Sequence, residues 1–171
     1  MHDHLSPLAQ RVGIWLAREC ANGMPRGFGD EVLDAFPDDN APALNRALAE
    51  LKAAGLVELS GAIGPKLKRA RPTYALFAAA DPTVTRHDPS RDAVVIARHL
   101  IEQPRLGVIR ELDANLGWDR RRFNAALGQL LDLFPSNRRS GEVQMDYPTV
   151  QLLVMDDEVI ALQRFIRANA R

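Results

Sequence analysis

The chain has 171 residues, 46% of them apolar, and its 22 basic residues balance its 22 acidic ones. This length allows one domain or two small ones, and the apolar share suits a soluble protein with a buried core rather than a disordered chain. No apolar run approaches the ~20 residues of a membrane-spanning helix, and the first residues lack the basic-then-apolar order of a secretion signal, so we expect a cytoplasmic protein with no membrane partner.

Periodic apolar residues predict three helices and then a β-hairpin in the first half of the chain. Ser6 followed by Pro7 is typical of an N-cap and a first helical position. Asn40 can cap the third helix, and Gly55 can end that helix in the left-handed conformation. The predicted elements are helices over 5–20, 28–36 and 40–55, and strands over 56–59 and 73–78 on either side of a basic loop.

The same order of elements starts again after a linker that is rich in charge and proline. Asp119 can cap the third helix of this second copy. The closing strand even echoes the first copy in its letters, with YPTVQLL at 147–153 against RPTYALF at 71–77, so two copies of one unit are the simplest account. The second copy is predicted to contain helices over 92–103, 107–116 and 118–134 and the strand over 147–153.

Residues 156–169 predict one more amphipathic helix, with acidic residues at its start and arginines at its end, an order that favours the helix dipole. Its apolar side needs cover, so the helix either packs across the two units or pairs with a second chain in a homodimer. The expected domains are a first unit over 1–82, a linker over 83–91, a second unit over 92–155 and the C-terminal helix over 156–171.

The first copy resembles the winged helix-turn-helix superfamily. LNRALAELKAAGLVEL, then a basic loop, then RPTYALF is similar to the third helix, wing and closing strand of bacterial transcriptional regulators. The resemblance covers about residues 5–79 and, more weakly, 92–155. It implies a mainly α fold with small β-hairpin wings (α+β), in which two tandem winged-helix units precede a C-terminal helix.

This resemblance implies a DNA-binding protein, most simply a transcriptional regulator, whose third helices read the major groove and whose wings contact phosphates of double-stranded DNA. Arginine side chains suit guanine edges and asparagine side chains suit adenine edges. The expected phosphate contacts of the first wing are Lys66, Lys68, Arg69 and Arg71, and those of the second are Arg138 and Arg139. The expected base contacts are Asn45 and Arg46 in the first unit and Arg120, Arg121, Arg122 and Asn124 in the second.

Other interpretations of these residues stay open. Exposed charge is the ordinary state of lysine and arginine, and the five acidic residues between Asp30 and Asp39 would repel phosphates. Tandem winged helices also resemble the chromosome-segregation subunits that bind kleisin proteins, and paired winged helices occur in plasmid and phage replication initiators. The chain carries no motif typical of an enzyme, so we expect no catalytic residues, no metal site and no cofactor.

Overall fold

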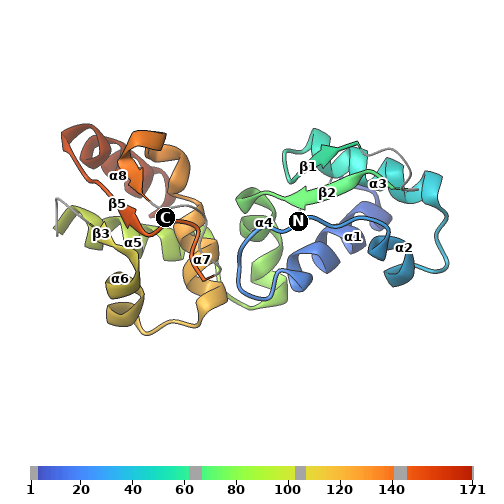
Figure 1. Cartoon of the computed structure of the whole chain (residues 1–171), viewed down its shortest axis with the longest axis horizontal. Helices are drawn as coiled ribbons and strands as arrows, with labels where there is room; N and C mark the ends of the chain where they lie inside the picture. The colour runs from blue at the N-terminus through green and yellow to red at the C-terminus, as the bar shows by residue number, and fades with distance from the viewer. Residues whose placement is uncertain (1–3, 62–66, 103–106, 141–145, 171) are drawn as a thin grey trace. The chain divides into compact units, whose positions relative to one another are not determined.

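The computed structural model describes residues 4–61, 67–102, 107–140 and 146–170. The chain divides into two units, one formed by Met1–Ala21 with Pro25–Arg86 and the other by Asn22–Met24 with His87–Arg171. Both are mainly helical, and each carries a small antiparallel sheet (Figure 1). Within the described ranges, every helix is too short or too polar to cross a membrane.

The first unit starts with three helices, continues with a hairpin and closes with a fourth helix. Its elements are α1 (Pro7–Glu19), α2 (Glu31–Ala35), α3 (Ala41–Ala53), β1 (Val57–Ser60), β2 (Arg69–Pro72) and α4 (Tyr74–Val84). In the hairpin, Ser60 lies opposite Arg69 and Val57 opposite Pro72. Phe28 forms an isolated bridge to Ala70 on the other edge of β2, with nitrogen-to-oxygen distances of 2.8 Å in both directions.

Local signals correctly predicted the start of α1 and both ends of α3. The Ser6 side chain accepts a hydrogen bond from the backbone N–H of Ala9, and the Asn40 side chain accepts one from that of Ala43. Gly55 follows α3 with a φ of +72°, the left-handed conformation expected of it.

The segment from Tyr74 onward is a helix, so the prediction of a returning strand over 73–78 is wrong. The strand that returns is β2, which ends at Pro72. Thr73 holds the junction, because its hydroxyl donates to the carbonyl oxygens of Gly55 and Leu56 at 2.8 and 3.0 Å. The following run contains four alanines, which favour a helix. The helix α4 packs against α1 and buries Leu76 and Phe77 in the core of the unit.

The second unit repeats this order. Its elements are α5 (Pro89–Glu102), β3 (Gly107–Val108), α6 (Ile109–Leu116), α7 (Arg120–Gly128), the 3-10 turns η1 (Leu131–Leu133) and η2 (Ser136–Arg138), β4 (Arg139–Ser140), β5 (Gln151–Leu152) and α8 (Asp156–Asn169). Asp119 caps α7 as predicted, since its carboxylate accepts from the backbone N–H of Arg122 at 2.9 Å. The helix predicted over 118–134 is shorter than expected, because α7 ends at Gly128 and a 3-10 turn follows.

The two units share one topology. In each, a short strand or bridge follows the first helix and pairs with the last strand, which lies in the middle of the sheet. In the first unit, β2 lies between Phe28 and β1. In the second unit, β5 lies between β3 and β4. The first helix packs against the third and the fourth in both units, as α1 does with α3 and α4 and α5 does with α7 and α8. The helix α8 is therefore the counterpart of α4 and completes the second copy.

The C-terminal helix packs within its own unit. It lies against α5 and the turn η1, and Leu162 is fully buried there. The alternative in which the helix also packs across the two units stays a prediction. Formation of the helix over Asp156–Asn169 agrees with the predicted range, whereas the homodimer stays a prediction.

Candidate nucleic-acid interface

Two arginines point to solvent from the central strand of the first unit. Along β2, Arg69 and Arg71 are exposed, whereas Ala70 and Pro72 are buried, as the two-residue period of a strand requires. In the described part of the chain, neither arginine forms an ion pair. Glu58 lies opposite Arg71 in the strand register and is itself exposed. The strand thus presents two guanidinium groups to water.

A third arginine joins them from the loop between α1 and α2. Arg26 lines an open hollow together with Ser60, Arg69 and Arg71. Its guanidinium carbon lies 4.0 Å from the centre of the Phe28 ring, and its Nε donates to the Glu19 carbonyl oxygen at 3.2 Å. Stacking and the hydrogen bond hold the side chain in place. No sequence pattern predicted this residue, because the loop is brought to β2 by the long-range bridge between Phe28 and Ala70.

Gly27 leaves room for Arg69 in this hollow. A Cβ atom at position 27 would collide with the Nε and Cζ atoms of Arg69. The absence of a side chain at this point therefore allows the guanidinium of Arg69 to lie over the loop. Pro25 on the other side of Arg26 completes the rim.

The hairpin is anchored by two side chains of the helical layer. The backbone N–H of Lys68 donates to Asn45 Oδ1 at 3.3 Å, and that of Leu67 donates to Asp30 Oδ1 at 3.0 Å. Asn45, expected to read bases, thus has its carbonyl oxygen engaged by the hairpin. Arg46 is exposed on α3 and Lys68 is exposed beside β2, whereas Lys66 lies outside the described residues.

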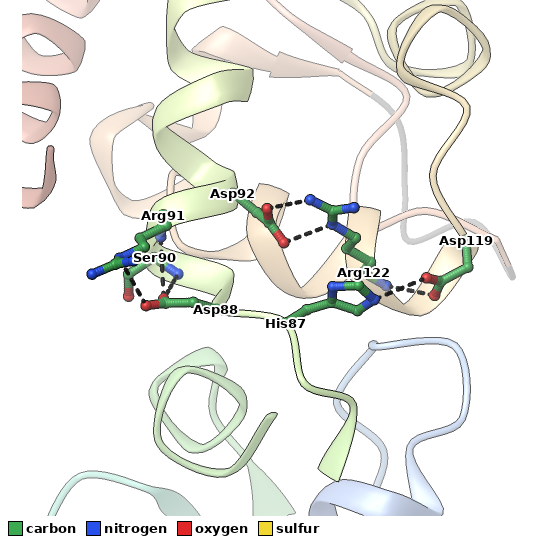
Figure 2. A network of polar contacts seen from close by, with 7 residues as sticks. All are labelled: His87, Asp88, Ser90, Arg91, Asp92, Asp119 and Arg122. Atoms are coloured by element: carbon green, nitrogen blue, oxygen red, sulfur yellow. Dashed lines mark hydrogen bonds and ion pairs between the residues drawn. The ribbon is translucent and has the colours of Figure 1, made fainter. Parts of the chain in front are cut away.

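In the second unit, Arg122 is held by an acidic side chain. Its Nε and Nη2 atoms donate to the two carboxylate oxygens of Asp92 at 2.8 and 2.7 Å (Figure 2). Its guanidinium carbon also lies 4.1 Å from the centre of the Trp118 ring. The hydrogen bonds to Asp92 raise the pKa of the Arg122 guanidinium above its ordinary value. This paired arginine faces α5 within the unit.

Arg120 is engaged in a similar way. Its Nη2 lies 3.2 Å from Asp113 Oδ2, and its guanidinium carbon stacks 4.0 Å from the centre of the Tyr147 ring. The Tyr147 hydroxyl donates to the same carboxylate of Asp113 at 2.7 Å. Burial and this hydrogen bond raise the pKa of Tyr147 above its ordinary value.

The other four residues of the second unit that were expected to contact DNA differ in burial and in bonding partners. Asn124 is fully buried and donates through Nδ2 to the carbonyl oxygen of Asp146 at 2.8 Å, so its expected exposure on α7 is wrong. Arg138 lies 3.7 Å from the buried carboxylate of Glu158. Arg121 and Arg139 are half-buried. Several polar side chains of α7, the helix that was expected to read bases, therefore bond groups of their own unit, because α7 packs closely on α5.

Among the described residues, no group of three or more histidine, cysteine, aspartate or glutamate side chains could hold a metal ion. No protein-family model, no curated protein and no solved structure matches the chain.

Proposed function

We propose that this chain is a non-enzymatic double-stranded DNA-binding protein that regulates transcription through two winged-helix units. The order of helix, short strand or bridge, two helices, two strands and a final helix supports the winged-helix assignment of both units. The central position of the last strand in each sheet supports it further. No catalytic residue is part of this proposal.

One observation carries the DNA-binding proposal: Arg69 and Arg71 project from the same side of β2 into solvent, without an ion pair in the described part of the chain. Unpaired arginines on a projecting hairpin can approach phosphates without disturbing a core. Each phosphate that such a group neutralises releases condensed counterions, which gives affinity that falls with added salt. Arg46 on the exposed side of α3 is the remaining candidate for a base contact in this unit.

The two units have different roles in this proposal. In the second unit, Arg120 and Arg122 already satisfy carboxylates of their own unit, and a DNA contact would have to break those bonds. Removing a charged partner from a partly buried ion pair costs free energy that the DNA contact would have to offset. The first unit therefore supplies most of the DNA affinity.

The internal pairing of Arg120 and Arg122 favours a second candidate function, in which the chain as a whole is a protein-binding module. A unit whose third-helix arginines are neutralised internally is suited to binding a protein, as in the kleisin-binding chromosome-segregation subunits that tandem winged helices resemble. The balance of 22 basic and 22 acidic residues is consistent with this candidate. In that case the complete protein would bind a protein partner and show no affinity for duplex DNA.

A salt-titrated binding assay on a mixed-sequence duplex tests the proposal. In the test variant, Lys66, Lys68, Arg69 and Arg71 are all changed to alanine. A matched control removes four exposed arginines of the second unit, with Arg91, Arg98, Arg164 and Arg167 changed to alanine, and has the same net charge as the test variant. We expect the test variant to bind more weakly and its slope of log affinity against log salt to fall by about 0.9 for each lost phosphate contact.

Equal losses in the test and control variants would show that only net charge matters and would contradict a wing-based interface. Absence of duplex binding by the unmodified protein at low salt would reject the DNA-binding function and favour the protein-binding candidate.

A further inference from the structure

The most specific basic feature of the first unit is the open hollow that Pro25, Arg26 and Gly27 form with Ser60, Arg69 and Arg71 of the hairpin. We propose that Arg26, Arg69, Arg71 and Ser60 form a binding site for a single phosphate of the DNA backbone. This inference rests on the proposed function, but it adds a residue from outside the hairpin and a defined position for one phosphate.

Three separate segments build the hollow. The loop before α2 brings Pro25, Arg26 and Gly27, the end of β1 brings Ser60, and β2 brings Arg69 and Arg71. The bridge between Phe28 and Ala70 fastens the loop to the strand. Because backbone hydrogen bonds join all three segments, the positions of the cationic groups are fixed more tightly than those on a free loop.

Arg26 is already oriented before a ligand binds. Its Nε and Nη2 atoms are 3.2 Å from the carbonyl oxygen and 3.4 Å from the carboxylate of Glu19, and its guanidinium stacks on Phe28. These contacts leave Nη1 without a hydrogen bond in the described part of the chain. A group that is held in place loses less conformational entropy when it binds a ligand.

The local charges suit a phosphodiester. Three guanidinium groups, from Arg26, Arg69 and Arg71, share this side of the unit with the carboxylates of Glu19 and Glu58. The set therefore has a net charge of +1, which complements the single negative charge of one backbone phosphate. Guanidinium groups match the geometry of phosphate oxygens, and the Ser60 hydroxyl is a further donor.

Gly27→Ala provides the sharpest test, because it removes no charge. Its new methyl group would collide with the end of the Arg69 side chain and force it to move, whereas the backbone at position 27 needs no left-handed conformation. Gly61→Ala is the matched control, since a Cβ there meets nothing within 4 Å. Arg26→Ala is a second test, and thermal unfolding of every variant shows whether the unit is folded.

Binding is measured against a duplex over a range of salt concentrations. We expect Gly27→Ala and Arg26→Ala each to weaken binding about tenfold, the effect of losing one charged hydrogen bond. We expect each also to reduce the salt slope by about 0.9, the value for one phosphate. Gly61→Ala should bind like the unmodified protein.

Two results would overturn the site. If the unmodified protein binds the duplex and both test variants bind equally well, the hollow is not a phosphate site, although the DNA-binding function stands. If the unmodified protein does not bind the duplex, but inorganic phosphate shifts the NMR signal of the Arg69 Nε–H in the unmodified protein and not in Gly27→Ala, the hollow binds small oxyanions and its assignment to the DNA backbone is wrong.

Discussion

The ion pair between Asp92 and Arg122 allows a quantitative test of how the second unit is held together. It joins the first turn of α5 to the first turn of α7 through two hydrogen bonds of 2.7 and 2.8 Å. The side chain of Asp92 is 11% exposed and that of Arg122 is 28% exposed. The perturbation is Asp92→Ala, which leaves Arg122 without its carboxylate partner.

The expected cost lies between two limits. Breaking a fully buried pair costs about 3–5 kcal/mol, because the remaining charge cannot reach water. An exposed pair contributes only about 0–1 kcal/mol, because water and salt screen it. Arg122 retains some contact with solvent, so we expect Asp92→Ala to lower the free energy of unfolding of the second unit by about 2 kcal/mol, within the range measured for charged hydrogen bonds.

The assay is a double-mutant cycle in urea, with Asp92→Ala, Arg122→Met and the double variant followed by circular dichroism. The cycle isolates the energy of the pair, which we expect to be about 1–2 kcal/mol. Arg91→Ala is the matched control on the same helix, since its Nε lies 3.5 Å from Asp88 and its side chain is 72% exposed (Figure 2). Its effect should stay within about 0.5 kcal/mol.

The reasoning would be refuted if Asp92→Ala costs no more than Arg91→Ala. A coupling energy near zero, with a large cost for each single variant, would also refute it, because the two side chains would then stabilise the unit through separate contacts.

Three further outcomes are expected, each measured as a shift in the urea unfolding midpoint. Gly55→Ala should destabilise the first unit by about 1 kcal/mol through backbone strain alone, because φ is +72° there and a Cβ would contact nothing within 4 Å; an unchanged midpoint would contradict this. Tyr147→Phe should cost about 1–2 kcal/mol by removing a buried hydrogen bond to Asp113, and a smaller loss than that of Arg91→Ala would count against it. The hydrogen bond from the Ser6 backbone N–H lowers the pKa of Glu50, so its stabilising effect is present above the ordinary glutamate pKa and disappears as the pH falls through the lowered value. Glu50→Gln should therefore be less stable than the unmodified protein at pH 7 and similar to it at acidic pH, and a difference that is independent of pH would exclude this explanation.

Sequence patterns predicted the helix caps well, because a cap depends on residues close together in the chain. Ser6, Asn40 and Asp119 each bond a backbone N–H only three residues ahead. The range of α8 was also predictable from the sequence, since its charged and apolar residues follow the helical period over its fourteen residues.

The prediction over 73–78 failed because a short apolar run does not distinguish a strand from a helix. The similar letters of RPTYALF and YPTVQLL reinforced the error. In the first copy the strand ends at Pro72, whereas in the second it begins at Gln151, after the corresponding proline. The similarity in letters therefore does not correspond to the same position in the two folds.

Side-chain pairings between distant residues were not predictable from sequence patterns. Arg69 and Arg71 were predicted to lie in a basic loop, whereas they lie on β2, where the two-residue period of a strand places them on one side. The bond from Arg122 to Asp92 spans thirty residues, and Arg26 meets Arg69 over an even longer separation. Such proximity depends on how helices pack, and no local spacing encodes it.

Because each unit is completed by its own last helix, we expect truncation of the chain before α8 to affect the second unit and not the first. Deleting the chain after Met155 would remove α8 from the side of α5 on which it packs and leave that side of α5 in contact with water. The equivalent cover of α1 comes from α4, which the deletion leaves intact. In a truncated chain, the apolar side of α5 would then be exposed to solvent and prone to aggregation, whereas the first unit would keep α4 packed on α1.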